Sequence, residues 1–132
     1  MKKYLLDTNM CIFYIKGQYN LHAKISEIGD RYCYISEVTV AELKYGVQNS
    51  SFTEKNQSTI NEFIADFAVI LMYNSLNIYA QEKARLKRSG TIIPDFDILI
   101  GSTAINNDMV MVTNNVAHFN RLENIIIEDW TK

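Results

Sequence analysis

The feature that most constrains the fold is a repeated alternation of short apolar runs with segments of helical spacing. The runs have the length and the β-branched or aromatic content of strands, and the segments between them carry apolar residues at intervals of three and four. Strands that alternate with helices form a parallel sheet wrapped by helices, because a parallel connection needs a crossover. The expected fold class is therefore α/β, with five strands at residues 3–6, 32–35, 68–72, 109–113 and 125–127.

Capping residues and a proline mark where the helices begin. Thr8 or Asn9 is suited to cap the first helix, and Ser36 is suited to cap the second, which we expect over residues 38–47. Pro94 suits the first turn of a later helix. Further helical spacing covers residues 60–67, 79–90 and 94–106.

The size and composition are those of one globular domain. The chain has 132 residues and a hydrophobic share of 48%, and its single Pro and five Gly leave no material for a linker, so we expect one domain over residues 1–132. No stretch has the length of a membrane span or of a signal sequence, and we expect a cytoplasmic protein. Cys11 and Cys33 have no partner at metal-ligand spacing and are interpreted as small buried apolar residues.

The charge balance limits how the chain can hold a nucleic acid. Its formal net charge of −2 argues against a broad electrostatic grip on phosphates. The only concentrated basic stretch comprises Lys83, Arg85, Lys87 and Arg88. This stretch suits local guidance of a nucleic acid, and it equally suits cations that complement the end of a helix dipole.

Polar residues that directly follow predicted strands are the first candidates for a site. The crevice of an open α/β sheet lies beyond the carboxyl ends of its strands. Asp7 follows the first strand, and Thr113, Asn114 and Asn115 stand at the end of the fourth. Asp7 is equally well explained as a helix N-cap, which contributes about 1 kcal/mol. On position alone, both interpretations stay open.

Glu42 is a second candidate because of its neighbours. It lies in an otherwise apolar helix, with Thr39 three residues before it and Gly46 four residues after it. Residues at these intervals share a helix face, so small side chains leave space around the carboxylate. A solvated Glu near the end of a helix would look the same, and Glu42 needs partners to count as a site residue.

Asp97 is the third candidate and has to be separated from Asp95. Both fall in the first turn after Pro94, where the helix dipole favours negative charge. Two residues correspond to about 200° around a helix, so the two carboxylates point to different faces. Asp97 has Gly101 four residues after it. We therefore assign Asp97 to a site and Asp95 to the dipole or to solvent.

Convergence of Asp7, Glu42 and Asp97 would require a cation. Carboxylates about 5 Å apart repel one another by about 3 kcal/mol per pair at an effective dielectric constant near 20. A divalent cation removes this repulsion. A set of oxygen ligands with no Cys and no close pair of His suits Mg²⁺ or Mn²⁺.

Several motifs in a fixed order identify a family resemblance. The chain resembles a PIN-domain ribonuclease of the VapC toxin type over residues 3–130. The motifs are Leu6-Asp7-Thr8-Asn9, then Ser36 through Thr39 to Glu42-Leu43 and Gly46, then Asp97-Ile98-Leu99-Ile100, then Val112-Thr113-Asn114-Asn115 with His118-Phe119, and finally Glu128-Asp129-Trp130.

This resemblance implies a complete functional picture. It implies a three-layer α/β/α fold, dependence on Mg²⁺ or Mn²⁺, and endonucleolytic hydrolysis of RNA by metal-activated water that leaves 5′-phosphate and 3′-hydroxyl ends. It also implies a homodimer, a cognate VapB-type antitoxin that inserts a segment over the active site, and contact with operator DNA only through that antitoxin. Tyr14, Tyr45 and Tyr73 are spare aromatics suited to a dimer contact or to the core.

The resemblance also assigns roles by position. Asp7, Glu42 and Asp97 match the principal acids of the family, which are its metal ligands. Many members carry a further acid where this chain has Asn115 and His118. Asn115 is expected to ligate the metal through its carbonyl or to hold a metal-bound water, and Thr113 to orient a carboxylate or the substrate phosphate. His118 is interpreted chiefly as a surface residue.

Three other classes match parts of the pattern. A haloacid-dehalogenase-like phosphatase also has a strand followed by Asp, but it needs a second Asp where Asn9 stands. A phospho-receiver domain needs paired acids after the first strand and a late Lys. A PIN-like binding module without catalysis is disfavoured by the intact acids and kept open by Asn115. Metal-dependent RNA cleavage separates this last class from the enzyme.

Overall fold

The computed structural model describes residues 1–132 and contains one all-parallel sheet of five strands in the order β3-β2-β1-β4-β5. The strands are β1 (Tyr4–Leu6), β2 (Cys33–Ser36), β3 (Ala68–Ile70), β4 (Val110–Val112) and β5 (Ile127–Glu128). The helices are α1 (Thr8–Ile15), α2 (Leu21–Ile28), α3 (Glu37–Gln48), α4 (Thr53–Ala65), α5 (Leu76–Arg88), α6 (Asp95–Asn106) and α7 (Val116–Phe119), with short 3-10 turns η1 (Asp30–Tyr32) and η2 (Tyr73–Ser75).

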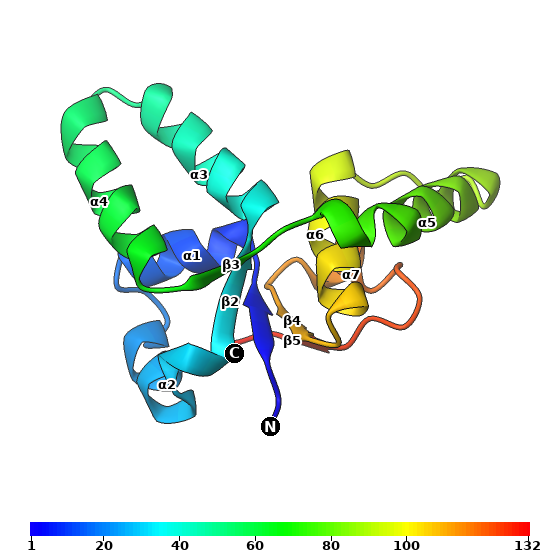
Figure 1. Ribbon diagram of the computed structural model, residues 1–132, viewed down its shortest axis with the longest axis horizontal. Coiled ribbons are helices and arrows are strands. Elements are labelled where there is room, and N and C mark those ends of the chain that lie inside the picture. Colours follow the sequence, from blue (N-terminus) through cyan, green and yellow to red (C-terminus); the bar gives the residue numbers. More distant parts are fainter.

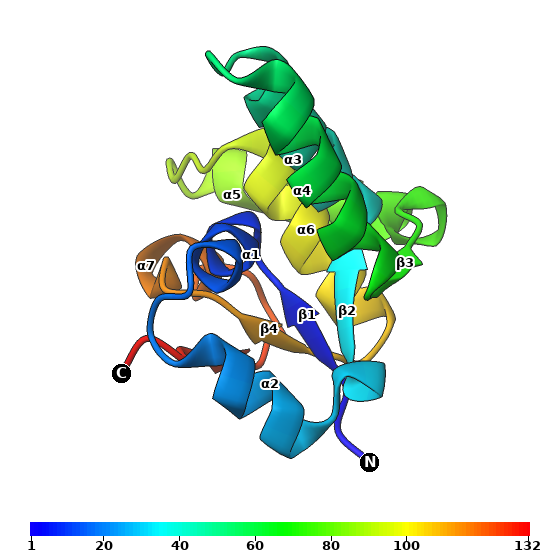
Figure 2. The ribbon, with the colours of Figure 1, turned by 90° about the vertical axis from the view of Figure 1, so that its left-hand side faces the viewer.

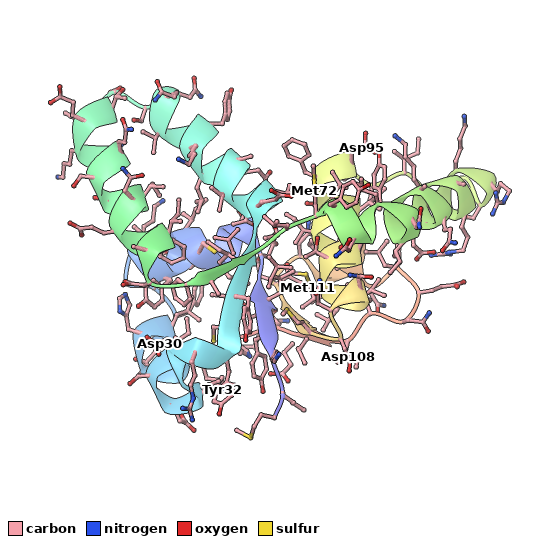
Figure 3. The ribbon with its side chains drawn as sticks, in the orientation of Figure 1. Asp30, Tyr32, Met72, Asp95, Asp108 and Met111 are labelled. Carbon is pink, nitrogen blue, oxygen red and sulfur yellow. The ribbon has the colours of Figure 1, made fainter.

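Helices cover both faces of the sheet, which gives three layers (Figure 1). Successive residues of a strand point to opposite faces. Leu6 enters the core shared with α1, α2 and α4, whereas Leu5 enters the core shared with α5, α6 and α7. Val112 and Met111 repeat this division in β4, and Figure 3 shows Met111 between the sheet and α6. The predicted three-layer α/β/α fold with a parallel sheet is confirmed.

The strand order reverses beside β1, and a binding crevice is expected at this point of the sheet. β2 and β3 lie on one side of β1, while β4 and β5 lie on the other. Loops that leave neighbouring strands in opposite directions open a crevice at the carboxyl ends. Asp7 follows β1 and Thr113 follows β4. The hairpin of α3 and α4 rises from the same end of the sheet (Figure 2).

The prediction of a buried third strand was wrong. β3 stops at Ile70 and lies at the edge of the sheet, where only β2 pairs with it. Val69 is 36% exposed, and Leu71, just past the strand, is 65% exposed. The side chains of β3 are only partly covered, so an apolar run alone does not report burial on both faces of a strand. β5 also begins at Ile127, later than predicted.

Several helix starts differ from the prediction, since α4 begins at Thr53 instead of residue 60 and α5 at Leu76 instead of residue 79. α1 is capped by Asp7, while Thr8 and Asn9 lie inside the helix. α2 was not predicted at all. Its N-cap, Asn20, is of a residue type favoured at helix starts, but it has a left-handed backbone (φ 58°) and makes no side-chain capping bond.

Other expectations about the interior agree with the structure. Cys11 and Cys33 are buried free thiols. Ser36 caps α3 by accepting a hydrogen bond from the backbone N–H of Thr39 at 3.0 Å. Each of the seven helices is too short or too polar to pass through a lipid bilayer.

Candidate active site

Asp7 is the most buried of the three predicted acids, with 5% of its surface exposed. The backbone N–H of Thr8 donates to its Oδ1 at 2.7 Å, and the hydroxyl of Thr113 donates to its Oδ2 at 2.8 Å. Asp7 is thus the N-cap of α1 and also the centre of a polar cluster. The two interpretations left open by its position coincide in one residue.

The electrostatics of Asp7 show uncompensated negative charge. Burial raises the pKa of the Asp7 carboxyl to about 6 from an ordinary value of 3.8, against the opposing effect of the hydrogen bonds from Thr113 and Thr8. The charges of Asp97 and Glu42 raise this pKa further. No lysine or arginine forms an ion pair with any of these three acids. The space they share therefore attracts a cation.

Glu42 is held by a line of hydroxyl groups. The hydroxyl of Thr8 lies 2.6 Å from Glu42 Oε1 and 3.0 Å from Thr39 Oγ1, and Ser36 Oγ lies 3.2 Å from Thr39 Oγ1. Each hydroxyl has a single hydrogen to donate, so the consistent direction runs from Ser36 to Thr39, then to Thr8, and ends on Glu42. Ser36 and Thr39 are fully buried. One carboxylate oxygen of Glu42 is thereby fixed by the protein.

Asp97 is contacted by a residue of the segment that follows β4. The Nδ1 atom of His118 lies 3.1 Å from Asp97 Oδ2 and 2.9 Å from the side-chain amide of Asn115. The backbone N–H of Asn115 donates to Thr113 Oγ1 at 2.9 Å. This short segment therefore touches both Asp7, through Thr113, and Asp97, through His118. The side chain of Asn115 does not cap α7.

Asp95 lies apart from this cluster. Its carboxylate pairs with Lys83 at 2.8 Å and accepts a hydrogen bond from the Tyr79 hydroxyl at 3.0 Å. Figure 3 shows it at the outer end of α6, beside α5. The structure thus separates Asp95 from Asp97 in the way that the helical angle predicts.

The two glycines near the acids have different roles. A Cβ atom at Gly46 would meet no neighbour, and this residue lines an open cavity of about 290 Å³ together with Glu42. A Cβ atom at Gly101 would collide with the side chain of Leu122. Gly101 therefore allows α6 to pack closely, and it does not create space around Asp97.

Half of the basic stretch on α5 is used within the fold. Arg85 forms a two-pronged ion pair with Glu82, at 2.8 and 2.9 Å, and Lys83 is paired as described above. Lys87 and Arg88 are exposed and form no ion pair. Within this stretch, Lys87 and Arg88 alone remain free to attract a phosphate.

The carboxylate oxygens of Asp7, Glu42 and Asp97 suit a divalent cation, although the three side chains are not grouped around one point. No three Asp, Glu, His or Cys side chains are spaced as a metal-binding group. The acids are neighbours linked through hydroxyls and an imidazole. Glu42 Oε2 and Asp97 Oδ1 accept no hydrogen bond, and both are hard oxygen ligands. A cation among them would offset both the burial that chiefly raises the pKa of Asp7 and the smaller effect of the neighbouring acids.

Sequence reasoning undervalued two residues that complete this network. Thr8 was interpreted as a helix cap, but its hydroxyl holds Glu42. A small hydroxyl residue directly after a strand-end acid is the signal that points to such a role. His118 was interpreted as a surface residue, and no local pattern indicates that it reaches Asp97.

Comparisons with known proteins agree with this geometry. Residues 4–124 match the PIN domain family. The chain is 37% identical to Ribonuclease VapC2 of Rickettsia felis, with 98% of each chain covered. It is 36% identical to the tRNA(fMet)-specific endonuclease VapC of Salmonella typhimurium, covering 98% of this chain and 99% of that one. The crystal structure of DNA-bound VapBC from Salmonella typhimurium contains a chain that superposes with a TM-score of 0.92 at 34% identity, covering 98% of this chain and 99% of that one.

Proposed function

This chain belongs to the PIN-domain family, and from that premise we propose that it is the VapC-type toxin of a VapBC pair, an endoribonuclease that acts in the cytoplasm. Its relatives are named as ribonucleases over nearly the same length. The observation that carries the proposal is the linked set of Asp7, Glu42 and Asp97 at the switch point of the sheet, with the raised pKa of Asp7. Such a set suits the hydrolysis of a phosphodiester bond with a divalent cation.

The residues of the cluster have distinct roles in this reaction. Asp7, Glu42 and Asp97 would hold Mg²⁺, or Mn²⁺ in its place. When bound, the cation offsets the charge of the scissile phosphate and lowers the pKa of the attacking water. Thr113 keeps Asp7 oriented by donating to Oδ2, and the backbone of Asn115 keeps Thr113 in place. The side-chain amide of Asn115 would hold a metal-bound water, and Lys87 and Arg88 would attract the RNA backbone.

We assign the antitoxin to the cavity beside Glu42. This cavity lies between α1, α3 and α4. Its lining combines aliphatic side chains (Ile12, Ile15, Leu43, Val47 and Ile60) with Glu42, Lys16, Asn56 and Thr59. An amphipathic antitoxin segment seated there would cover Glu42. The Salmonella relative occurs in a VapBC complex with DNA. We infer that operator DNA is bound through the antitoxin, because the toxin chain itself has a net charge of −2.

We assign a homodimer contact to an exposed apolar surface next to β3. Leu71, Tyr73, Leu76 and Phe96 are all exposed there, with Tyr73 at 77%. η2 and the beginning of α6 lie side by side, so these side chains form one region. Tyr14, in contrast, packs against Phe63 within the fold and is not available for this contact.

Purified protein is expected to cut RNA only when a divalent cation is present. The first substrate to test is tRNA(fMet), for which the Salmonella relative is named, followed by total RNA. The rate should rise with Mg²⁺ into the millimolar range, and Mn²⁺ should support faster cleavage at equal concentration because it tolerates mixed ligands. Asn115→Asp should lower the Mg²⁺ concentration needed for the half-maximal rate. Cleavage that survives chelation would refute the metal requirement, and superimposable curves would remove Asn115 from the site.

Asp95→Asn is expected to retain most of the activity, in contrast to Asp97→Asn. The Asp95 carboxylate faces Lys83 at the surface, and exposed ion pairs contribute little to stability. The two substitutions are chemically identical and only two residues apart, so each serves as the control for the other. Initial rates of RNA cleavage at saturating Mg²⁺ provide the measurement. Equal losses in the two variants would mean that the site assignment on α6 is wrong.

A further inference from the structure

His118 is the only imidazole in the acid cluster, and the fold fixes its position. Its side chain is 38% exposed, while the Asp97 side chain that it contacts is 20% exposed. The next residue, Phe119, is completely buried in the core beneath α6. Because α7 is anchored through Phe119, the ring of His118 is held at the edge of the site.

The position of the hydrogen on His118 follows from its neighbours. A nitrogen lone pair facing the Asp97 carboxylate would be repelled, so Nδ1 carries the hydrogen and donates to Asp97 Oδ2. Nδ1 then cannot accept a hydrogen bond from the amide of Asn115, which lies 2.9 Å away. Turning that amide by 180° brings its Oδ1 toward Nδ1 and resolves the conflict. The N–H of His118 is then shared by Asp97 and Asn115.

This arrangement commits one oxygen of Asp97 and leaves the other free. Oδ2 accepts from His118, and Oδ1 has no partner in the protein. Glu42 is held in the same manner, since Oε1 accepts from Thr8 and Oε2 has no partner. Both of the less buried acids therefore have one oxygen bound to the protein. The His118 imidazole thus holds one oxygen of Asp97, as the Thr8 hydroxyl holds one oxygen of Glu42.

We propose that His118 is a positioning residue for Asp97: its Nδ1–H holds Oδ2 and thereby turns Oδ1 toward the space shared with Asp7 and Glu42. The inference rests on the proposed function, because the orientation of Oδ1 matters for catalysis only if the acids hold a cation. Loss of a group that orients a metal ligand typically weakens metal binding by about 10- to 100-fold. In this arrangement His118 itself contacts neither the cation nor the RNA.

Three substitutions separate the two ring nitrogens. The side-chain amide nitrogen of Asn occupies nearly the position of His Nδ1, and that of Gln occupies nearly the position of Nε2. Mn²⁺ binding to the RNA-free protein, measured by titration calorimetry, should weaken by about 10-fold or more in His118→Ala and His118→Gln. His118→Asn should retain most of the parental affinity. In cleavage assays at one Mn²⁺ concentration that half-saturates the parent, kcat should fall in the Ala and Gln variants while KM for RNA stays unchanged.

The outcomes that overturn the inference are distinct from those that overturn the proposed function. Parental Mn²⁺ affinity in His118→Ala, or retention in His118→Gln with loss in His118→Asn, would overturn the positioning role. Asp97→Asn is the reference for the function: if the parent binds Mn²⁺ and this variant does not, the metal site stands whatever His118 does. A parent that neither binds Mn²⁺ nor cuts RNA would overturn both. A role confined to stability would lower the melting temperature without separating Asn from Gln.

Discussion

Asp7→Asn, Glu42→Gln and Asp97→Asn are each expected to abolish RNA cleavage while the fold stays intact. Each change removes one charged ligand from the set that would hold the cation, and the remaining two carboxylates cannot offset the lost charge. The measurements are cleavage of RNA with a divalent cation and growth arrest after induction in cells. Asp95→Asn is the matched control, because it removes the same charge outside the cluster.

The same three variants distinguish a metal site from a structural cluster by their stability. Without metal, each substitution reduces the repulsion among the acids, so the variants should melt no lower than the metal-free parent. A cluster that only stabilised the fold would show the opposite, since removing a buried hydrogen-bonded carboxylate would then destabilise the protein. Near-parental cleavage by two of the three variants would show that the metal-site assignment is wrong.

The metal-free protein is expected to lose stability as the pH rises through the pKa of Asp7. In the folded state this pKa is about 6, above the ordinary value of 3.8, so folding favours the protonated form. The stabilisation is complete below about pH 4 and is lost as the pH passes through about 6. The difference between the two pKa values, about 2 units, corresponds to about 3 kcal/mol in the free energy of unfolding.

Urea unfolding of the parent and of Asp7→Asn, from about pH 4 to about pH 8, isolates this contribution. All other titrating groups are common to both proteins, so the difference between the two curves reports Asp7. The difference should be small at low pH and should favour Asp7→Asn at high pH. A divalent cation that binds the ionised acids should restore the stability of the parent at high pH. Parallel curves would contradict the raised pKa of Asp7.

The sequence pattern predicted which strand ends and helices carry the candidate residues, because hydrophobic spacing fixes where strands and helices lie in the chain. An apolar run that ends in Asp7 places a carboxylate at the carboxyl end of a strand, and β4 does the same for Thr113. Glu42 and Asp97 follow from helix positions that the capping residues Ser36 and Pro94 mark. Alternation of strand and helix predicted a parallel sheet, and a parallel sheet aligns its carboxyl ends at one edge.

The connections between these residues were beyond any local pattern. Thr113 and Asp7 are 106 residues apart, Thr8 and Glu42 are 34 apart, and His118 and Asp97 are 21 apart, yet each pair is joined by a hydrogen bond. Such contacts depend on strand order and on side-chain rotamers, which are set by packing of the whole chain. The same holds for β3, whose apolar residues were consistent with a buried strand.

The sequence by itself therefore determined the α/β class and the order of strands and helices, since both follow from hydrophobic spacing and from capping along a few consecutive residues. Its family resemblance nominated the three acids. Only the tertiary structure decided that Thr8 holds Glu42 and that His118 holds Asp97. It also decided that Lys83 pairs with Asp95. The reason is that a hydrogen bond or an ion pair requires two atoms within about 3 Å. Residues distant in the chain reach that separation only after the sheet and its helices have assembled.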